Sequence, residues 1–326
     1  MSLMLRTRVY CNGKIEAEEF PLAKVSDYLE DKRTIVWVDF TDPTEADLAG
    51  LEEELNLHQL AVEDAVQSNQ RPKLDHYATH NFLVCYDVRL DSKTGELATS
   101  EIKAFITPRA LVTVHRADFS MADIVARWDS APDLAVHGMA YLIWGLLDTI
   151  VDGQFDAIQS LDNEIETLED QLFENHKPRS TLVQRRSFEL RKSLVLLRRV
   201  VLPMREVIGA LLRRDVVQTD PAIIPYLQDV YDHVLRVTDW TDSLRDLVNT
   251  ILETNISLQG NRMNLVMKKV TSWAAIIAVP TLVTGFYGQN VPYPGFSAPW
   301  GFWVSSALII GAPIALYAAF KRHDWL

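Results

Sequence analysis

Residues 270–287 read VTSWAAIIAVPTLVTGFY, and this run contains no charged side chain. A helix of this length and composition is what a chain needs to cross the hydrocarbon core of a bilayer, which is about 30 Å thick. Residues 300–320, WGFWVSSALIIGAPIALYAAF, form a second uncharged run. Pro280 and Pro313 do not exclude spanning helices, because neighbouring groups can satisfy the backbone that proline leaves unpaired. The sequence therefore predicts two transmembrane helices near its C-terminus.

The residues that flank these runs argue against the alternative, which is a pair of core helices in a soluble protein. Lys268 and Lys269 precede the first run, and Lys321 and Arg322 follow the second. Both basic ends then lie on one side, which the positive-inside rule makes cytoplasmic. Aromatic residues typical of an interfacial belt gather at the other side, namely Tyr287, Tyr293, Trp300 and Trp303.

This pattern predicts a location in the cell (inner or plasma) membrane, with the lipid bilayer as a partner and both termini cytoplasmic. Residues 288–299, GQNVPYPGFSAP, would form a short extracytoplasmic loop, since they are too rich in Pro and Gly for a helix. Residues 321–326 would form a basic cytosolic tail. The first residues contain no apolar signal-peptide segment, so we expect the rest of the chain to stay in the cytosol.

The composition limits which classes of partner the soluble part of the chain can bind. The 326 residues carry a formal net charge of −12, which argues against nucleic acid, because duplex binding needs a basic surface. The sequence contains two cysteines, Cys11 and Cys85, which lie far apart in the chain. This favours free thiols in a reducing compartment over a disulfide framework. No P-loop, nucleophile elbow or dinucleotide-binding fingerprint is present, so the sequence predicts neither an enzyme nor an ATP-driven pump.

Residues 1–135 alternate between strand-like and helix-like patterns. Five stretches are rich in the β-branched and aromatic residues that are typical of strands: RTRVYC, TIVWVDF, NFLVCYDVRL, and the pair IKAFIT and ALVTVHR. Two helices are predicted in this region. The first is PTEADLAGLEEEL, with Asp42 as N-cap and Pro43 at the first helical position, and the second is HQLAVEDAVQ. We expect a cytosolic α/β (α+β) domain.

Residues 136–269 read as helical throughout. An acidic helix at 140–175 is interrupted at Asn175, Lys177 and Pro178, and a basic helix follows at 180–214. Opposite charges and a short turn predict an antiparallel hairpin. A third helix begins near Pro225 and meets no strong breaker before Pro280. It therefore continues as a stalk into the first membrane span.

One face of this third helix is small or polar almost throughout. We call it the small-residue face; in alternating steps of three and four it comprises Asn264, Met267, Thr271, Ala274, Ala278, Thr281, Gly285 and Gly288. Such a face suits tight packing between helices of a membrane anchor. It equally suits the wall of a pore shared by several subunits. Two spans alone cannot enclose a water-filled path, so the second interpretation requires an oligomer.

Four stretches together resemble the CorA family of divalent-cation (magnesium) transporters, which are GxN-type two-span membrane proteins. They are Gly288-Gln289-Asn290, which closes the first span, the tail KRHDWL, VEDAVQSNQRPK at 62–73, and PYLQDVYDHVLRVTDWTDSLRDLV at 225–248. The likeness covers essentially the whole chain. It implies a funnel-shaped homopentamer in which each subunit contributes a cytosolic domain, a helical stalk and a pore-lining first span.

The resemblance also implies which residues meet the ion. Mg²⁺ keeps several of its waters, and uncharged donors and acceptors can bind those waters without removing them, whereas a ring of carboxylates would hold the ion too tightly to conduct. The expected pore and selectivity residues are Gly288, Gln289, Asn290, Thr281, Asn264 and Met267. Met267 would form an apolar constriction.

A regulatory metal site follows from the same resemblance. Asp64 and Asp229 match the family's paired sensor aspartates on adjacent subunits, and Glu63 and Asp232 stand close enough in sequence to assist. The implied function is passive, channel-type uptake of hydrated Mg²⁺, driven by the membrane potential and closed by cytosolic Mg²⁺. Mg²⁺ would be both the transported and the regulatory ion, with no organic cofactor.

One departure from the family pattern leaves the identity of the transported ion undecided. Magnesium-transporting members often follow GMN with an acidic MPEL loop, whereas residues 291–301 read VPYPGFSAPWG, with no carboxylate. A zinc-transporting branch also lacks MPEL, so Zn²⁺, Co²⁺ and Ni²⁺ remain alternatives to Mg²⁺. A membrane-anchored oligomeric sensor or scaffold is the alternative of another class. His76 and His80 have a spacing that suits zinc on a helix, but surface histidines are the favoured interpretation.

Overall fold

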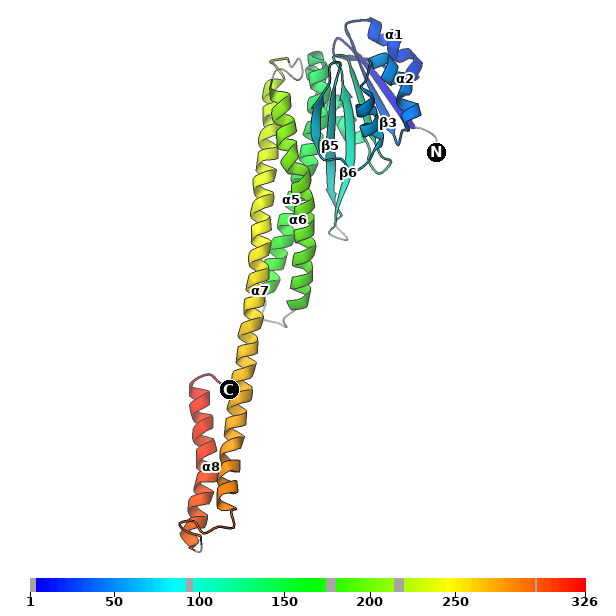
Figure 1. The fold of residues 1–326 in the computed structure, drawn as a ribbon. Helices are drawn as coiled ribbons and strands as arrows, with labels where there is room; N and C mark the ends of the chain where they lie inside the picture. The colour runs from blue at the N-terminus through cyan, green and yellow to red at the C-terminus, as the bar shows by residue number, and fades with distance from the viewer. Residues whose placement is uncertain (1–3, 92–95, 174–179, 214–219, 297) are drawn as a thin grey trace. The chain divides into compact units, whose positions relative to one another are not determined.

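The computed structural model describes residues 4–91, 96–173, 180–213, 220–296 and 298–326 (Figure 1). The chain divides into two compact units, Met1–Ile251 and Leu252–Leu326. The first contains a mixed sheet and a group of helices, and the second contains two helices and the loop between them.

The N-terminal unit is built on a seven-stranded sheet with the order β2-β1-β3-β7-β6-β5-β4. Its strands are β1 (Met4–Cys11), β2 (Lys14–Glu18), β3 (Thr34–Thr41), β4 (Lys73–His76), β5 (Asn81–Leu90), β6 (Leu97–Ile106) and β7 (Ala110–His115). The central strands β3 and β7 run parallel, and the other neighbouring pairs are antiparallel. The five strand-like runs of the sequence are therefore confirmed as β1, β3, β5, β6 and β7.

The two strands that the sequence pattern missed lie at the edges of the sheet. Four of the five residues of β2 are exposed, and β4 has only four residues, none of them buried. Neither strand has the buried, alternating apolar residues on which a strand prediction depends. Short and polar edge strands are also the ordinary protection against edge-to-edge association.

Helices cover both faces of the sheet. On one face, α2 (Glu45–Leu55) and α3 (Gln59–Val66) bury Leu48 and Val62 against Phe40 and Phe82. On the other face lies α5 (Met139–Phe173), which contacts β5, and α4 (Ala122–Ser130) packs on α5 (Figure 1). Two short helical turns, η1 (Leu22–Lys24) and η2 (Pro132–His137), and the helix α1 (Val25–Glu30) complete the connections.

The predicted start of α2 is wrong by two residues. The helix begins at Glu45 and its N-cap is Thr44, not Asp42. The Asp47 carboxylate accepts hydrogen bonds from the Thr44 amide at 2.8 Å and from the Thr44 hydroxyl at 2.6 Å. The bond from the Thr44 amide is one half of a capping box, and the Thr44 side chain faces the Asp47 amide to complete it, which satisfies amides at the helix start. Asp42 lies in the preceding turn with φ of 49°, and its carboxylate accepts from the Ala117 amide at 3.1 Å.

The three long helices follow the predicted pattern. The acidic and basic helices are α5 and α6 (Ser180–Leu212), joined by an ion pair of 2.7 Å between Arg186 and Glu164. The predicted interruption at Asn175, Lys177 and Pro178 lies outside the described residues. The third helix, α7, runs from Ile224 to Tyr287 with Pro280 inside it. In the N-terminal unit it is held by Arg198 of α6, which lies 2.7 Å from Asp242.

The C-terminal unit contains the end of α7 and the helix α8 (Pro299–Arg322). Both are long and apolar enough to cross a membrane, with mean hydropathies of 1.5 and 1.7 in their apolar windows. Only 11% of the α7 window and 0% of the α8 window are buried in the described structure. Core helices of a soluble protein would be mostly buried, so the exposure supports membrane spans.

Gly145 in α5 generates a stability prediction. Trp128 of α4 is fully buried, and its ring nitrogen donates to the Leu142 carbonyl at 3.1 Å. A Cβ atom at Gly145 would overlap the indole ring. We expect Gly145→Ala to lower the free energy of unfolding by about 1–3 kcal/mol, because overpacking displaces the ring. Chemical denaturation of the purified protein, followed by tryptophan fluorescence, measures the change.

Gly50→Ala is the matched control for this substitution. Gly50 lies in the middle of α2, and a Cβ atom there has no neighbour within 4 Å. Its replacement should raise the free energy of unfolding by up to about 1 kcal/mol through helix propensity alone. Equal unfolding midpoints for the two variants would contradict the proposed clash at Trp128.

Candidate ion pathway and cytosolic metal site

Within the C-terminal unit, α8 packs on one face of α7 and leaves the small-residue face uncovered. The rings of Trp273 on α7 and Tyr317 on α8 lie 6.4 Å apart, and Ser272 and Ile276 are buried. With 3.6 residues per turn, the small-residue face lies on the opposite side of α7. Every one of its members is exposed in the single chain: Asn264, Met267, Thr271, Ala274, Ala278, Thr281, Gly285 and Gly288. The chain itself therefore offers this face no partner among the described residues.

Two shallow grooves follow the small-residue face. One is lined by residues that include Asn264, Met267 and Thr271 together with Trp325 of the C-terminal tail. The tail reaches this position because Asp324 adopts a left-handed conformation with φ of 53°, and Trp325 then stacks on Phe320 with ring centroids 5.6 Å apart. The second groove is lined by Ala278, Thr281, Gly285 and Gln289, with Leu282 and Phe286 beside them.

The motif Gly288-Gln289-Asn290 follows directly on the last turn of α7. The Gly288 amide donates to the Thr284 carbonyl at 2.9 Å, and the Gln289 amide donates to the Phe286 carbonyl at 3.4 Å. A Cβ atom at Gly288 would lie only 2.8 Å from the Thr284 carbonyl oxygen. Glycine therefore lets the helix end tightly at this position, and both Gln289 and Asn290 are exposed beyond it.

Residues 288–299 are called the GQN loop, and among those that the structure describes an aromatic cluster holds Tyr293 against the end of α7. The Tyr293 hydroxyl donates to the Tyr287 carbonyl at 3.2 Å, and the two rings lie 5.0 Å apart. Phe296 lies 5.2 Å from Tyr293 on its other side. The hydrogen bond satisfies one of the carbonyl groups that a helix leaves unpaired at its C-terminus. Tyr293 thus ties the loop to the end of α7, immediately beside the GQN motif.

Asp64, one of the predicted metal ligands, lies on α3 and already has a cationic partner in its own chain. The Lys73 ammonium lies 2.6 Å from the Asp64 carboxylate and 2.7 Å from that of Asp75. Partial burial disfavours the charged carboxylate, but hydrogen bonds from Lys73 and Gln70 and the positive charges of Lys73 and Lys103 together outweigh it and hold the pKa of Asp64 below its ordinary value. Asp64 is therefore ionised at neutral pH. Sequence reasoning missed Lys73, although it ends the quoted stretch at 62–73.

The other predicted ligands, Glu63, Asp229 and Asp232, are exposed. Asp229 and Asp232 lie on the first turns of α7, and Glu63 on α3 accepts a hydrogen bond from Gln67 at 2.8 Å. No hydrogen bond or ion pair between described residues joins Asp64 to Asp229. In the described part of the chain, no group of three or more His, Cys, Asp or Glu residues is placed to hold a metal ion.

Asp229 instead faces acidic residues of α5 that sequence reasoning missed. Asp148 and Asp152 lie one turn apart, and Asp148 is 4% exposed and forms an ion pair with Arg127 of α4. Burial raises the pKa of Asp148, Arg127 opposes the rise, and Asp152 and Asp229 add to it through like-charge repulsion. Asp148 and Asp152 are four residues apart, which places them on the same face of α5, and this spacing could have predicted the acidic cluster from the sequence.

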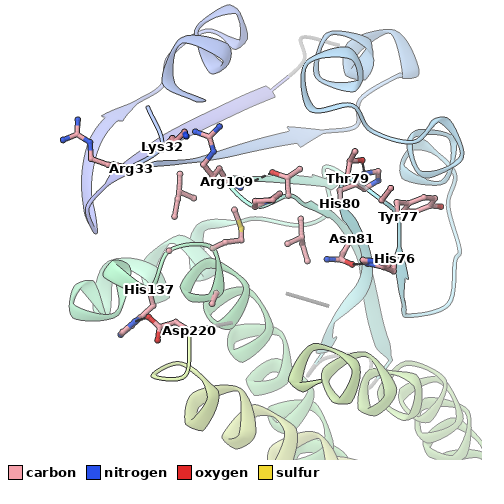
Figure 2. A pocket seen from close by; sticks show the side chains of 18 of the residues that line it. Lys32, Arg33, His76, Tyr77, Thr79, His80, Asn81, Arg109, His137 and Asp220 are labelled. Carbon is pink, nitrogen blue, oxygen red and sulfur yellow. Dashed lines mark hydrogen bonds and ion pairs between the residues drawn. The ribbon is translucent and has the colours of Figure 1, made fainter. Parts of the chain in front are cut away.

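A separate cavity of about 460 Å³ lies in the N-terminal unit (Figure 2). Several of its polar groups are engaged within the chain: Arg109 bonds the carbonyl groups of Leu29 and Asp31, and His137 lies 2.8 Å from Asp220. His76 and His80 also line it, but they flank a turn and are not on a helix. None of the predicted pore or sensor residues lines this cavity.

His80 differs from the sequence interpretation, which placed both histidines on the surface. It is 3% exposed and stacks on Tyr77 with centroids 4.9 Å apart. Burial lowers the pKa of His80 to about 4, so the ring is neutral at physiological pH. His76 instead pairs with the Asn81 side chain at 2.7 Å.

Comparison with known proteins places these features in one family. A family model described as CorA-like Mg²⁺ transporter protein matches residues 32–322. The chain is 29% identical over 318 residues to the cobalt/magnesium transport protein CorA of Thermotoga maritima, covering 95% of this chain and 90% of that protein. It is 23% identical over 300 residues to the zinc transport protein ZntB of Yersinia pseudotuberculosis, covering 89% and 86%.

A solved structure gives the same result for the fold. The complete CorA magnesium transporter from Methanocaldococcus jannaschii matches with a TM-score of 0.78 and 21% identity over 98% of both chains. At this identity the match shows the shared fold, and the family assignment comes from the sequence model that spans most of the chain. The protein therefore belongs to the CorA-like Mg²⁺ transporter family, whose members carry divalent cations across membranes and are not enzymes.

Proposed function

We propose that the protein is a homo-oligomeric channel, a pentamer, that conducts hydrated divalent cations passively into the cell, with Mg²⁺ as its main ion. One observation carries the proposal: the small-residue face of α7 is uncharged, is exposed along its length in the single chain, and ends on Gly288-Gln289-Asn290. Copies of this face from several subunits would enclose a path that one subunit cannot. The relatives include a cobalt/magnesium transport protein, which supports a divalent metal ion as the cargo.

The chemistry of the GQN motif suits an ion that keeps its waters. Mg²⁺ dehydrates reluctantly and usually retains several waters. A ring of Asn290 amides and Gly288 carbonyls would hydrogen-bond to those waters, and Thr281 and Asn264 would do so further along the face. Met267 would form the apolar constriction that closes the path. Binding of this kind is weak enough to let the ion leave again.

The orientation of the chain in the membrane follows from its charges. Lys268, Lys269, Lys321 and Arg322 would lie at the cytosolic side, with both termini in the cytoplasm and the GQN loop outside. An inside-negative membrane potential would then drive uptake, at about 4.6 kcal/mol per 100 mV for two charges. No energy source besides the ion gradient is then needed.

Zinc is the second candidate ion, and one observation favours it. The GQN loop contains no carboxylate, and a zinc transport protein is among the relatives. The sensor or scaffold alternative that the sequence left open is not supported, because the chain belongs to a family of transporters.

Asn290→Ala tests the role of the motif. We expect the variant to assemble normally. Its Mg²⁺ uptake rate should fall by about tenfold or more, because each subunit loses an amide of the proposed ring. Uptake is measured with a magnesium-sensitive dye inside liposomes that contain the purified protein. Asn163→Ala, at an exposed position of α5, is the matched control and should transport at the wild-type rate. Wild-type uptake by the assembled Asn290→Ala variant would exclude the motif as the ion-selective ring.

The same liposomes discriminate between the candidate ions. At equal external concentrations and a fixed membrane potential, uptake of Mg²⁺ by the wild-type protein should exceed uptake of Zn²⁺, Co²⁺ and Ni²⁺. Faster Zn²⁺ uptake that external Mg²⁺ does not reduce would assign the protein to zinc transport instead.

We also expect Tyr293→Phe to slow uptake. The substitution keeps the aromatic ring but removes the hydroxyl that reaches the Tyr287 carbonyl, so the GQN loop is held less firmly beside the motif. Losing one neutral hydrogen bond costs about 1 kcal/mol, which predicts a several-fold lower uptake rate in the dye assay. Tyr317→Phe on α8 is the control. Equal rates for the two variants would show that the loop does not need this contact.

Closure by the transported ion is proposed to depend on Asp64 and Asp229 of adjacent subunits, assisted by Glu63 and Asp232. Bound Mg²⁺ would neutralise carboxylates that otherwise repel one another. The double variant Asp64→Ala, Asp229→Ala should therefore keep conducting when Mg²⁺ is high on the cytosolic side. The inhibition curve is measured in liposomes that contain increasing concentrations of internal Mg²⁺. An isotopic or fluorescent tracer ion is added outside, and its uptake rate is recorded. An inhibition midpoint unchanged from wild type would show that these aspartates are not the sensor.

A further inference from the structure

Lys73 lies between two carboxylates that belong to different elements. Its ammonium is 2.6 Å from Asp64 at the end of α3 and 2.7 Å from Asp75 on its own strand β4. The Lys73 and Asp64 side chains are only 21% and 28% exposed, and Asp75 is 40% exposed. The ammonium also lies 5.7 Å from the centre of the Phe82 ring. It is therefore a partly buried cation that contacts two carboxylates at once.

Several contacts fix the position of Lys73 relative to Asp64. The Glu101 carboxylate accepts from the amides of Asn69 and Gln70 at 2.9 and 3.1 Å, which holds the segment that leads to Lys73. The Gln70 side chain donates to the Asp64 carbonyl at 3.2 Å. The buried Lys103 ammonium donates to the Ala65 carbonyl at 3.1 Å. The approach of Lys73 to Asp64 is thus built into the fold and is not a chance meeting of surface side chains.

We propose that Lys73 is a tethered competitor of the regulatory ion: it pairs with both Asp64 and Asp75 when the ion is absent and keeps only its contact with Asp75 when the ion binds Asp64. The inference rests on the proposed role of Asp64 in the cytosolic sensor. It adds a residue of this chain that sets the ion concentration at which the sensor responds.

Electrostatics gives the reason for competition. An ammonium and a divalent cation on the same carboxylate repel each other, so an ion that binds Asp64 directly must displace Lys73. Asp75 reduces the cost of this displacement, because Lys73 keeps one carboxylate partner after it leaves the other. The site therefore binds the ion more weakly than a free carboxylate would, without being blocked.

The proposal makes predictions of opposite sign for two variants. Lys73→Met removes the competing charge and keeps most of the side chain, so the Mg²⁺ concentration for half-inhibition of uptake should fall by about fivefold, as expected for one partly exposed ion pair. Asp75→Asn removes the second carboxylate and holds Lys73 on Asp64, so the same concentration should rise by a few-fold. Lys73→Arg keeps the charge and should stay near wild type.

Two measurements on the full-length protein test this. One is the inhibition curve in liposomes, and the other is the Mg²⁺ concentration that half-protects the detergent-purified protein against limited proteolysis, which does not require transport. Midpoints equal to wild type for both Lys73→Met and Asp75→Asn would overturn the proposal and leave an ordinary structural ion pair. Shifts in the same direction for the two variants would also overturn it.

Asp64→Asn separates this inference from the proposed sensor itself. If Asp64→Asn leaves both midpoints at the wild-type values, the sensor role of Asp64 fails, and the role of Lys73 fails with it. If Asp64→Asn shifts the midpoints and Lys73→Met does not, Asp64 stays a ligand and only the role of Lys73 is lost. Opposite shifts for Lys73→Met and Asp75→Asn, with Lys73→Arg unchanged, support the proposal.

Discussion

The continuous backbone of α7 is the constraint on which the other features depend. One hydrogen-bonded helix from Ile224 to Tyr287 carries Asp229 near its start, the small-residue face near its end and the GQN motif directly after it. A helix is stiff along its axis, so residues on one turn cannot rotate independently of those on the next. Any rearrangement that turns the first part of α7 must be absorbed by bending or passed along the helix.

Local periodicity explains why the sequence predicted much of this architecture. The membrane runs, the strands of the buried sheet and the small-residue face are all defined by spacing along one element, and that information is present in the chain itself. The edge strands β2 and β4 lack such a pattern, because their side chains are mostly outside the core. The start of α2 was misplaced since Thr44 and Asp47 form a better cap than Asp42 offers.

The candidate metal site shows the limit of sequence spacing more clearly. Asp64 and Lys73 are separated by a loop, and Asp148 and Asp229 lie on different helices, so only the folded chain brings these charges together. Resemblance to a family suggested the two aspartates but not their partners within the chain. The uncovered side of α7 likewise became evident only once the position of α8 was known.

The composition of the GQN loop has a consequence for the conditions under which it would operate as the proposed entrance. Between Gly288 and Pro299 the chain contains no Asp, Glu, His, Lys or Arg, and the phenol of Tyr293 is tied to the end of α7. Protons therefore find no carboxylate, imidazole or amine to bind there. An acidic exterior would therefore not change the charge of this loop, in contrast to an entrance lined by carboxylates, where hydrogen ions and metal ions compete for the same oxygen atoms.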